Sequence, residues 1–387
     1  MQVAQIYGIL NTVTNELLGD SIIVAEDLSN IVDVGATFAD KVGYDNYVRS
    51  LVDHIGRVIF VDRVYAGRAP SVVRDGWEYG AILEKIATTL PEAQENESWN
   101  LQDGMSYDPF IFKKPDAVAK FFADRITFDI QLSITNEQVK GSFSNVNQLN
   151  GFMSMLYTAV ENSLTVKIDA LVMRTINSMI GETLYAEFPG GTYTSTGVRA
   201  VNLLALYNAT LAEANRITAA EFVKDPAALR FASYTMKNYV DRLKVMSTLF
   251  NIGSQERFTP EDRMSIVMLS EFANAVGTYL YNANGQFLTS EIKFPDAETV
   301  TYWQGSGIDY GFDSTSKINI KTGTGHDVEA DGILAVMFDR DALGVANTDR
   351  AVDSVYNGKG RFTNNFYHYT AGYWNDLNEN FIVFYVK

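Results

Sequence analysis

The feature that most constrains this fold is one uninterrupted helical pattern that runs from Ser144 to Ile180. Ser144 or Asn145 can cap its start, no proline interrupts it, and Gly181 is placed to end it. At 1.5 Å per residue the helix would be about 50 Å long, longer than the core of a typical single domain. Its apolar residues recur at intervals of three and four, the spacing of one helical face: Leu149, Phe152, Met153, Leu156, Val160, Leu164, Ile168, Leu171, Val172, Ile176 and Met179.

The opposite face of this predicted helix carries few charges, namely Glu161, Lys167, Asp169 and Arg174. Such a face predicts that something else, for example a neighbouring subunit, covers part of it. A long surface helix of a monomer remains an alternative on this evidence. Successive gaps of four residues drift away from a 3.5-residue repeat, so a coiled coil is disfavoured.

Composition narrows the class of protein. The 387 residues are 47% hydrophobic and 20% charged, which is typical of a globular chain. No apolar run approaches the roughly 18 residues that a membrane span needs, and the first residues do not resemble a signal peptide. Cysteine is absent, which excludes disulfides and thiolate chemistry. The net charge of −16 disfavours nucleic-acid binding by counterion release.

The segments before the long helix are less regular. Residues 1–45 are weakly patterned and predict either an arm or an ordinary N-terminal subdomain. Tyr47–Val64 predicts a short helix followed by a β-rich run. Residues 66–112 are rich in glycine and proline, and Leu90–Pro109 is polar and acidic. A loop-rich insertion of this length predicts a function of its own.

The segments after the long helix predict a small unit of mixed helices and strands. The run Arg263–Leu269 is continuously apolar and is expected to be buried on both faces. The other predicted elements are helices at Val198–Arg216, Met236–Phe250 and Ser270–Tyr281, and strands at Phe231–Tyr234, Glu298–Trp303, Gly332–Asp339 and Phe381–Val386.

No constellation of residues indicates catalysis. His54, His326 and His368 lie far apart without a metal-binding spacing, and His368 is expected in a packed aromatic patch. The glycine-rich Lys321–His326 lacks the phosphate-loop spacing, so a hairpin turn is expected. Asp339, Asp341 and Asp349 do not form a calcium loop, and Asp341 is expected to cap a turn. No catalytic, cofactor-binding or metal-binding residue is therefore predicted, and an enzyme is disfavoured.

The order of the parts and three stretches of sequence carry a family resemblance. The stretches are YVRSLVDHIGRVIFVDRV (Tyr47–Val64), DGILAVMFDRDALGV (Asp331–Val345) and NNFYHYTAGYWNDLNENFIVFYV (Asn364–Val386). The chain resembles the major capsid proteins of tailed bacteriophages, most closely the major head proteins of small short-tailed phages. The resemblance implies an α+β fold of the Hong Kong 97 type.

The resemblance also implies a division into domains. Residues 1–45 would be the N-terminal arm and residues 66–112 the E-loop. The A-domain would span 226–339. The P-domain would comprise 46–65, 113–225 and 340–387, with its spine helix at about 144–180. An additional immunoglobulin-like domain, which some relatives carry, is not expected after Lys387.

The implied function is that of a major capsid protein. Such a protein self-assembles through hexamers and pentamers into an icosahedral or prolate shell that encloses double-stranded DNA without binding it specifically. The expected partners are other copies of the chain, a separate scaffolding protein and a portal, with no membrane and no cofactor. The expected location is the virion capsid, assembled in the host cytoplasm. The alternatives are an encapsulin-like nanocompartment shell and, less favoured, a soluble α/β enzyme without a recognised motif.

The E-loop is expected to become ordered only against a neighbouring subunit, because it has few core residues. In unassembled protein, a protease is expected to cut it near Lys85 or in its acidic tip.

Overall fold

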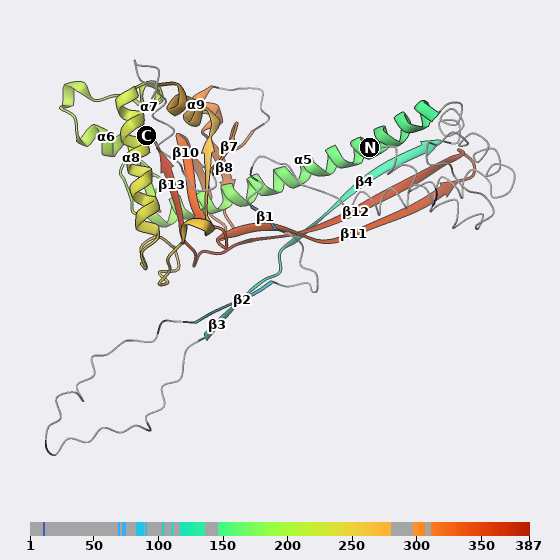
Figure 1. The fold of residues 1–387 in the computed structure, drawn as a ribbon, viewed down its shortest axis with the longest axis horizontal. Coiled ribbons are helices and arrows are strands. Elements are labelled where there is room, and N and C mark those ends of the chain that lie inside the picture. Colours follow the sequence, from blue (N-terminus) through green and yellow to red (C-terminus); the bar gives the residue numbers. More distant parts are fainter. Residues whose placement is uncertain are drawn as a thin grey trace.

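A computed structural model describes residues 72–74, 83–88, 117–135, 146–279, 297–305 and 311–387, together with the isolated positions 11, 69, 90, 103 and 110. In this structure one long helix runs from a compact body along a sheet of long strands (Figure 1). The predicted N-terminal arm, the P-domain segment 46–65 and most of the predicted E-loop lie outside the described residues, so those assignments stay predictions.

The long helix α5 spans Val146–Glu187, 42 residues, or about 63 Å. The predicted end near Ile180 was wrong, because Gly181 lies inside the helix. A Cβ atom at Gly181 would lie 2.9 Å from Ile320 Cδ1 and 3.1 Å from Thr322 Cγ2. The glycine therefore permits a close approach of the hairpin formed by β8 (Ile318–Lys321) and β9 (Asp327–Ala330).

The apolar face of α5 is buried as the spacing predicted. Leu164 and Ile168 are 1% and 3% exposed, whereas Val166 between them is 66% exposed. From Leu171 onward nearly every side of the helix is buried, because α5 contacts strands of both large sheets and the β8–β9 hairpin. The chain itself therefore covers the sparsely charged face mainly from Leu171 onward, whereas Val166 and Lys167 before it stay exposed.

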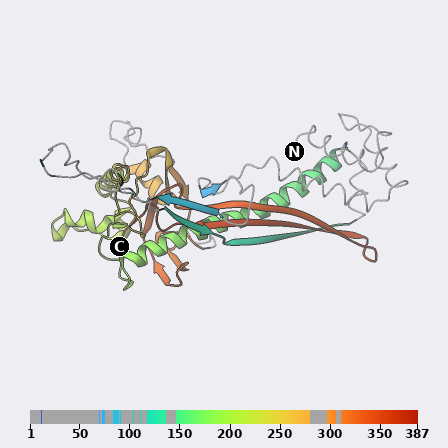
Figure 2. The same ribbon diagram turned by 90° about the horizontal axis from the view of Figure 1, so that it is seen from below.

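One sheet is built from long strands and lies along α5 (Figure 2). Its order is β1-β11-β12-β4. The strands β11, β12 and β4 pair antiparallel, and β1 is parallel to β11. Exposure alternates along β4, so that Ile126, Phe128 and Ile130 pack toward the core. The strands are β1 (Val73–Arg74), β4 (Arg125–Thr135), β11 (Leu343–Asn357) and β12 (Phe362–Asn375).

The second sheet forms the centre of the compact body, with the order β5-β13-β10-β6-β7. Every residue of β10 and β13 is buried, and β6 is nearly so. The continuous apolar runs thus predicted these buried strands correctly, although β6 and β13 flank β10 in antiparallel fashion. The strands are β5 (Ala200–Asn202), β6 (Met264–Leu269), β7 (Ala297–Val300), β10 (Ile333–Asp339) and β13 (Phe381–Tyr385).

The helices of the body correct three predictions. The predicted helix Met236–Phe250 ends at Leu243, and Ser247 beyond it forms an isolated β-bridge with Arg257. The predicted strand at 231–234 is part of α8 (Pro226–Leu243), which begins with Pro226 in its first turn and with the Asp225 carboxylate accepting a hydrogen bond from Ala227 N. The predicted helix 198–216 is instead β5 followed by α6 (Leu203–Ala209), because Ala200–Asn202 pairs with β13 and the Asn202 side chain caps α6.

The remaining helices are short. None of the described helices combines the length and the apolar character needed to cross a membrane. They are α7 (Ala219–Phe222), α9 (Ser270–Tyr279), α10 (Phe312–Thr315) and the 3-10 turns η4 (Glu213–Asn215) and η5 (Glu261–Arg263).

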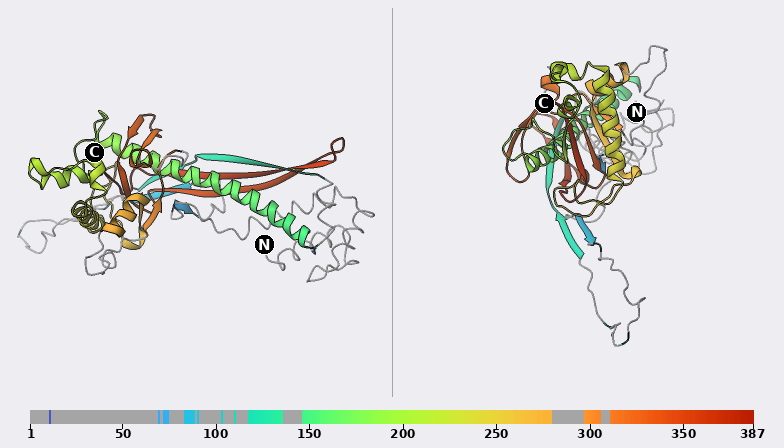
Figure 3. Two further views of the ribbon diagram at one scale, coloured as in Figure 1. Left: turned by 90° about the horizontal axis from the view of Figure 1, so that it is seen from above. Right: turned by 90° about the vertical axis from the view of Figure 1, so that its left-hand side faces the viewer.

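A narrow hairpin leaves the body near the point where the two sheets meet. It consists of β2 (Leu83–Thr88) and β3 (Ala117–Phe122), which pair antiparallel with each other. Figure 3 shows these strands pointing away from the body. The chain continues from β3 directly into β4 of the long sheet.

Strand pairing crosses two of the predicted boundaries, the one between the P-domain and the A-domain and the one between the E-loop and the P-domain. The segments β5 and β13, both assigned to the P-domain, lie in one sheet with β10 of the predicted A-domain. The two residues of β1, assigned to the E-loop, pair with β11. The division into domains therefore stays a prediction about the assembled protein, and hydrogen bonds connect its parts.

Candidate functional site: the charged base of the hairpin

The two-stranded hairpin presents two different faces. Along β2, Glu84, Ile86 and Thr88 are exposed, whereas the residues between them are partly buried. Lys85 lies directly opposite Lys120 of β3. Because side chains alternate between the faces of a strand, both lysines lie on the partly buried face.

The lysines meet an acidic turn that precedes the last strand. This turn joins β12 to β13 and contains Asp376 and Glu379. The Asp376 amide donates to Ala342 O at 2.6 Å, and the Glu379 amide donates to Asp376 O at 3.2 Å. The side chain of Asp376 is only 3% exposed. Backbone hydrogen bonds therefore fix both carboxylates in place.

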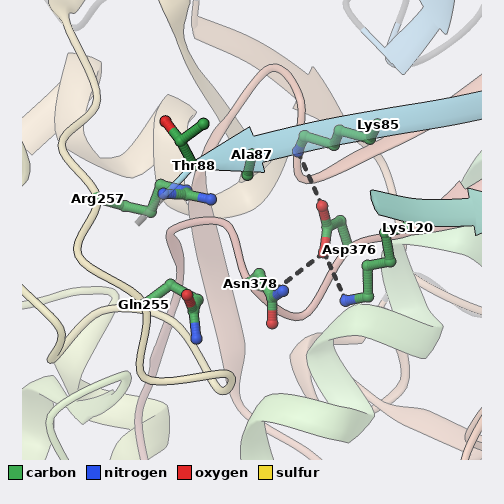
Figure 4. Close-up of a pocket in the computed structure, with 8 residues that line it drawn as sticks. All are labelled: Lys85, Ala87, Thr88, Lys120, Gln255, Arg257, Asp376 and Asn378. Carbon is green, nitrogen blue, oxygen red and sulfur yellow. Dashed lines mark hydrogen bonds and ion pairs between the residues drawn. The ribbon is translucent and has the colours of Figure 1, made fainter. Parts of the chain in front are cut away.

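Four ion pairs connect the hairpin and the acidic turn with a loop of the body, and Figure 4 shows the two that Asp376 makes with Lys85 and Lys120. Lys85 Nζ lies 2.8 Å from Asp376 Oδ2 and 2.7 Å from Glu379 Oε1. Lys120 Nζ lies 2.8 Å from Asp376 Oδ1. Arg257 Nε lies 3.3 Å from Glu379 Oε1. We call these five residues the hairpin clamp.

The pKa shifts within the clamp follow from its geometry. Burial alone raises the pKa of Asp376, but the hydrogen bonds from Lys120 and Lys85 outweigh it, so the pKa is lowered. Burial alone lowers the pKa of Lys85, but the hydrogen bonds to Asp376 and Glu379 outweigh it, so the pKa is raised. Both shifts show that the clamp favours the charged forms of these two groups.

The ion pairs of the clamp can position the hairpin relative to the body. Three cations hold two carboxylates, and no group of three or more potential ligands suited to a metal ion occurs among the described residues. Lys85 and Lys120 retain 23% and 38% exposure, so the clamp is partly hydrated. Such an arrangement can fix the direction in which the hairpin leaves the body, without a large apolar core beneath it.

The outer face of the hairpin carries two large apolar side chains that the described part of the chain does not cover, beside the polar Glu84 and Thr88. Ile86 is 66% exposed and Phe121 is 61% exposed. Ile86 lies opposite Ala119, and Phe121 lies opposite Glu84. A protruding face of this kind is typical of a surface that another molecule covers.

The groups considered from the sequence lie elsewhere, except Lys85. His326 stacks on Tyr185 at 3.8 Å between ring centroids. His368 was expected in an aromatic patch, but its Nδ1 lies 2.5 Å from Asp129 Oδ1 on the outer face of the long sheet. His54 lies outside the described residues.

Two turns were also considered from the sequence. The hairpin turn predicted at Lys321–His326 is confirmed, and Glu182 holds it by accepting hydrogen bonds from Thr324 N and Oγ1 at 2.8 and 2.7 Å. Asp341 was expected to cap a turn. Asp339 does so instead, because its Oδ1 accepts from Asp341 N at 2.9 Å.

No local sequence pattern predicts the hairpin clamp. Lys85, near which protease cleavage is expected in unassembled protein, lies within a paired strand and makes two ion pairs. The available signals were a pair of lysines in alternating strand patterns and the acidic residues Asp376 and Glu379 just before the last predicted strand. Lys85 and Asp376 are 291 residues apart, and no local pattern could bring them together.

Comparison with known proteins relates this arrangement to a family. The sequence profile of the Phi29-like phage major capsid proteins matches residues 10–385, nearly the whole chain. The chain belongs to this family. The family match supports the phage capsid interpretation, and it gives no support to the nanocompartment or enzyme alternatives.

Individual relatives of this Phi29-like chain are distant. The major capsid protein of Bacillus phage GA-1 is 25% identical over 223 residues, which cover 56% of this chain and 45% of that protein. The chain thus spans about half the length of this curated relative.

Solved capsid structures were also found. The capsid structure of Staphylococcus phage Andhra aligns with a TM-score of 0.48 at 12% identity, covering 84% of this chain and 86% of that one. The capsid structure of the cyanophage P-SCSP1u aligns with a TM-score of 0.45 at 12% identity, covering 85% and 91%.

The predicted α+β fold of the Hong Kong 97 type is confirmed by the family and by the parts described above. These parts are a long helix on a sheet of long strands, a protruding hairpin and a smaller body with a mixed sheet. The Phi29-like family is one of structural capsid proteins, so the chain is a phage capsid protein.

Proposed function

We propose that this chain self-assembles through hexamers and pentamers into an icosahedral or prolate shell that encloses packaged double-stranded DNA. Membership of the major capsid protein family supports this function. The observation that carries it within the structure is the protruding hairpin, whose base is clamped by charges and whose outer face exposes Ile86 and Phe121.

The physical argument concerns what stabilises such a hairpin. An isolated two-stranded hairpin is marginal in water, and further packing is needed to make it stable. Its inner face packs near the clamp, whereas its outer face finds no cover among the described residues. A neighbouring copy of the chain supplies that cover in a shell, where arms and hairpins add contact area that a compact body lacks.

The proposed domains follow the same reasoning. Residues 66–112 form the E-loop that reaches the neighbouring copy, and residues 1–45 form the N-terminal arm. The A-domain spans 226–339, and the P-domain comprises 46–65, 113–225 and 340–387.

The proposed partners are other copies of the chain, a separate scaffolding protein and a portal. The net charge of −16 is consistent with a wall that encloses DNA without binding it specifically. The protein acts in the virion capsid after assembly in the host cytoplasm, and it does not act as an enzyme or associate with a membrane.

Electron microscopy and sedimentation of the purified protein test this function, with the protein alone and with a candidate scaffolding protein. Closed hollow particles, or hexamers and pentamers, are expected. A monomer that persists at high concentration under both conditions would refute the proposal.

A further inference from the structure

The long sheet ends in an open strand. β4 (Arg125–Thr135) is the last strand in the order β1-β11-β12-β4, and within the described ranges no further strand pairs with it. All 11 of its residues pair with β12 on one side. Figure 2 shows β4 at the rim of the sheet. An edge of this length presents a row of backbone N–H and C=O groups with which another strand can pair.

The backbone groups that face the open edge can be assigned from one hydrogen bond. Tyr373 N donates to Asp124 O at 3.1 Å, and these two residues continue the register in which β12 pairs with β4. In an antiparallel ladder, every second residue of a strand exchanges its hydrogen bonds with the same neighbouring strand. The even-numbered residues of β4 therefore bond to β12, and the odd-numbered residues direct their N–H and C=O groups to the open edge.

The side chains of β4 lack the features that normally keep an edge strand from pairing. Such strands are usually protected by proline, lysine, a bulge or a charge that points inward. β4 has no proline and no lysine, and its register with β12 is regular throughout. Its inward-facing residues are all apolar, and all but the last remain partly exposed: Ile126, Phe128, Ile130, Leu132 and Ile134.

The sequence of β4 is complementary to itself in antiparallel orientation. About a twofold axis at Ile130, its middle residue, the strand overlaps β4 of a second copy along its whole length. Thr127 then lies opposite Ser133 of the second copy, and Asp129 lies opposite Gln131, so no like charges face each other. The inward-facing apolar residues lie opposite one another in the same way, and each would cover the exposed part of its counterpart.

Other registers fit less well. Shifting the second copy by one residue would place apolar opposite polar side chains and would misalign the hydrogen-bonding groups. An axis at Asp129 would place two carboxylates opposite each other and would shorten the overlap. The full-length register instead allows about twelve backbone hydrogen bonds between the two strands.

We propose that β4 of one copy pairs with β4 of a second copy across a twofold axis at Ile130, which joins two long sheets into one. This inference rests on the proposed shell function and concerns a different surface from that of the protruding hairpin. A contact between identical surfaces closes after two copies. It therefore cannot build a pentamer or a hexamer by itself, and in a shell it connects a copy in one ring with a copy in a neighbouring ring.

Paired cysteines test the register. The chain has no cysteine, so Thr127→Cys and Ser133→Cys can be introduced at exposed positions in separate chains, one of them tagged. In shells assembled from the mixture, oxidised glutathione should link tagged to untagged chains through a disulfide. Shells of either variant alone should give no link, because equal residues lie about 20 Å apart along the paired strands. The control is Thr127→Cys mixed with Ala351→Cys, an exposed position on β11 away from the open edge, and it should not link.

Proline tests the hydrogen bonds of the open edge. Gln131→Pro removes an N–H that points to this edge and leaves the bonds to β12 in place, and proline is tolerated on edge strands. The variant should keep the unfolding midpoint of the wild-type subunit and form rings that do not close into shells. Gln131→Thr, which keeps the N–H, is the control and should form shells. Normal shells from Gln131→Pro would overturn the inference, and if this variant does not fold, the cysteine test decides.

The outcomes separate this inference from the proposed function. Shells that form from the Thr127→Cys and Ser133→Cys mixture without the disulfide overturn the pairing and leave the shell function intact. This result is also the one expected if another segment of the same chain covers the edge. Wild-type protein that forms no oligomer under any condition refutes the shell function itself.

Discussion

Replacing Asp376 by asparagine is the sharpest test of the hairpin clamp. Asparagine nearly matches aspartate in shape but removes the charge that Lys85 and Lys120 share at 2.8 Å each. Lys85 would keep Glu379, whereas the described residues offer Lys120 no second carboxylate. The variant should therefore loosen β3 more than β2 at the base of the hairpin.

The expected magnitude follows from exposure. Removing one partner of a fully buried ion pair costs about 3–5 kcal/mol. Asp376 is 3% exposed, but Lys85 and Lys120 are 23% and 38% exposed and keep part of their hydration. We therefore expect the free energy of unfolding to fall by about 1–3 kcal/mol, between the values for exposed and buried pairs.

Urea unfolding of the isolated subunit measures this change, and hydrogen exchange of the β2 and β3 amides locates it. Glu261→Gln is the control, because it removes a carboxylate that is 55% exposed, rather than 3% as in Asp376, from its ion pair with Lys244 at 2.6 Å, and it should leave hairpin exchange unchanged. If Asp376→Asn leaves both the unfolding free energy and the hairpin exchange unchanged, the clamp does not hold the hairpin.

Four further predictions follow from the structure. Leu164→Asp or Ile168→Asp should yield insoluble protein in an expression trial, because burial of the unpaired charge costs at least about 2–7 kcal/mol. Val166→Asp, on the exposed side of α5, should remain soluble. Soluble Leu164→Asp would contradict the burial. The Asp376 carboxyl group has a pKa below its ordinary value of 3.8, so its charge stabilises the fold above pH 3.8 and this contribution is lost as the pH falls through the lowered pKa. The difference in unfolding free energy between wild type and Asp376→Asn should therefore disappear at that low pH. A difference that stays constant during acid titration would contradict this prediction. Deleting residues 89–108 should preserve the circular dichroism of the subunit but abolish shells in sedimentation. Protease should cut this segment in free subunits but not in shells. Normal shells from the deletion variant would argue against an intersubunit role. Gly332→Ala should lower the unfolding free energy by about 1–3 kcal/mol, because φ at this residue is +74° and the new Cβ would lie 2.0 Å from Val386 O. Gly190→Ala, which has open space around it, should leave the unfolding free energy unchanged. An unchanged unfolding free energy in Gly332→Ala would contradict the geometry.

The sequence predicted those parts of the fold that depend on local pattern. The three-and-four spacing identified α5, and continuous apolar runs identified β6, β10 and β13, because burial dictates which residue types recur there. The pattern failed at the end of α5. Gly181 resembles a helix stop in sequence, but its role depends on Ile320 and Thr322, which approach from a distant hairpin.

The site was not predictable in the same way. A lysine on an exposed-looking hairpin and an aspartate in a turn are ordinary features of a sequence, and each alone predicts a solvated surface. Asp376 becomes buried only when β13 enters the central sheet and brings the preceding turn against the hairpin.

The core and the hairpin base are held together by different kinds of contact. Under the proposed function, this difference explains how one chain fits into both hexamers and pentamers. Residues of β10 and β13 interlock in a dry core, where a displaced side chain leaves a cavity or a clash. The hairpin clamp instead uses partly hydrated lysines, whose long side chains can follow a small rotation of the strands while keeping their carboxylate partners. A rigid body and an ionic hinge thus place adaptability where neighbouring copies meet, while the core stays the same in every copy.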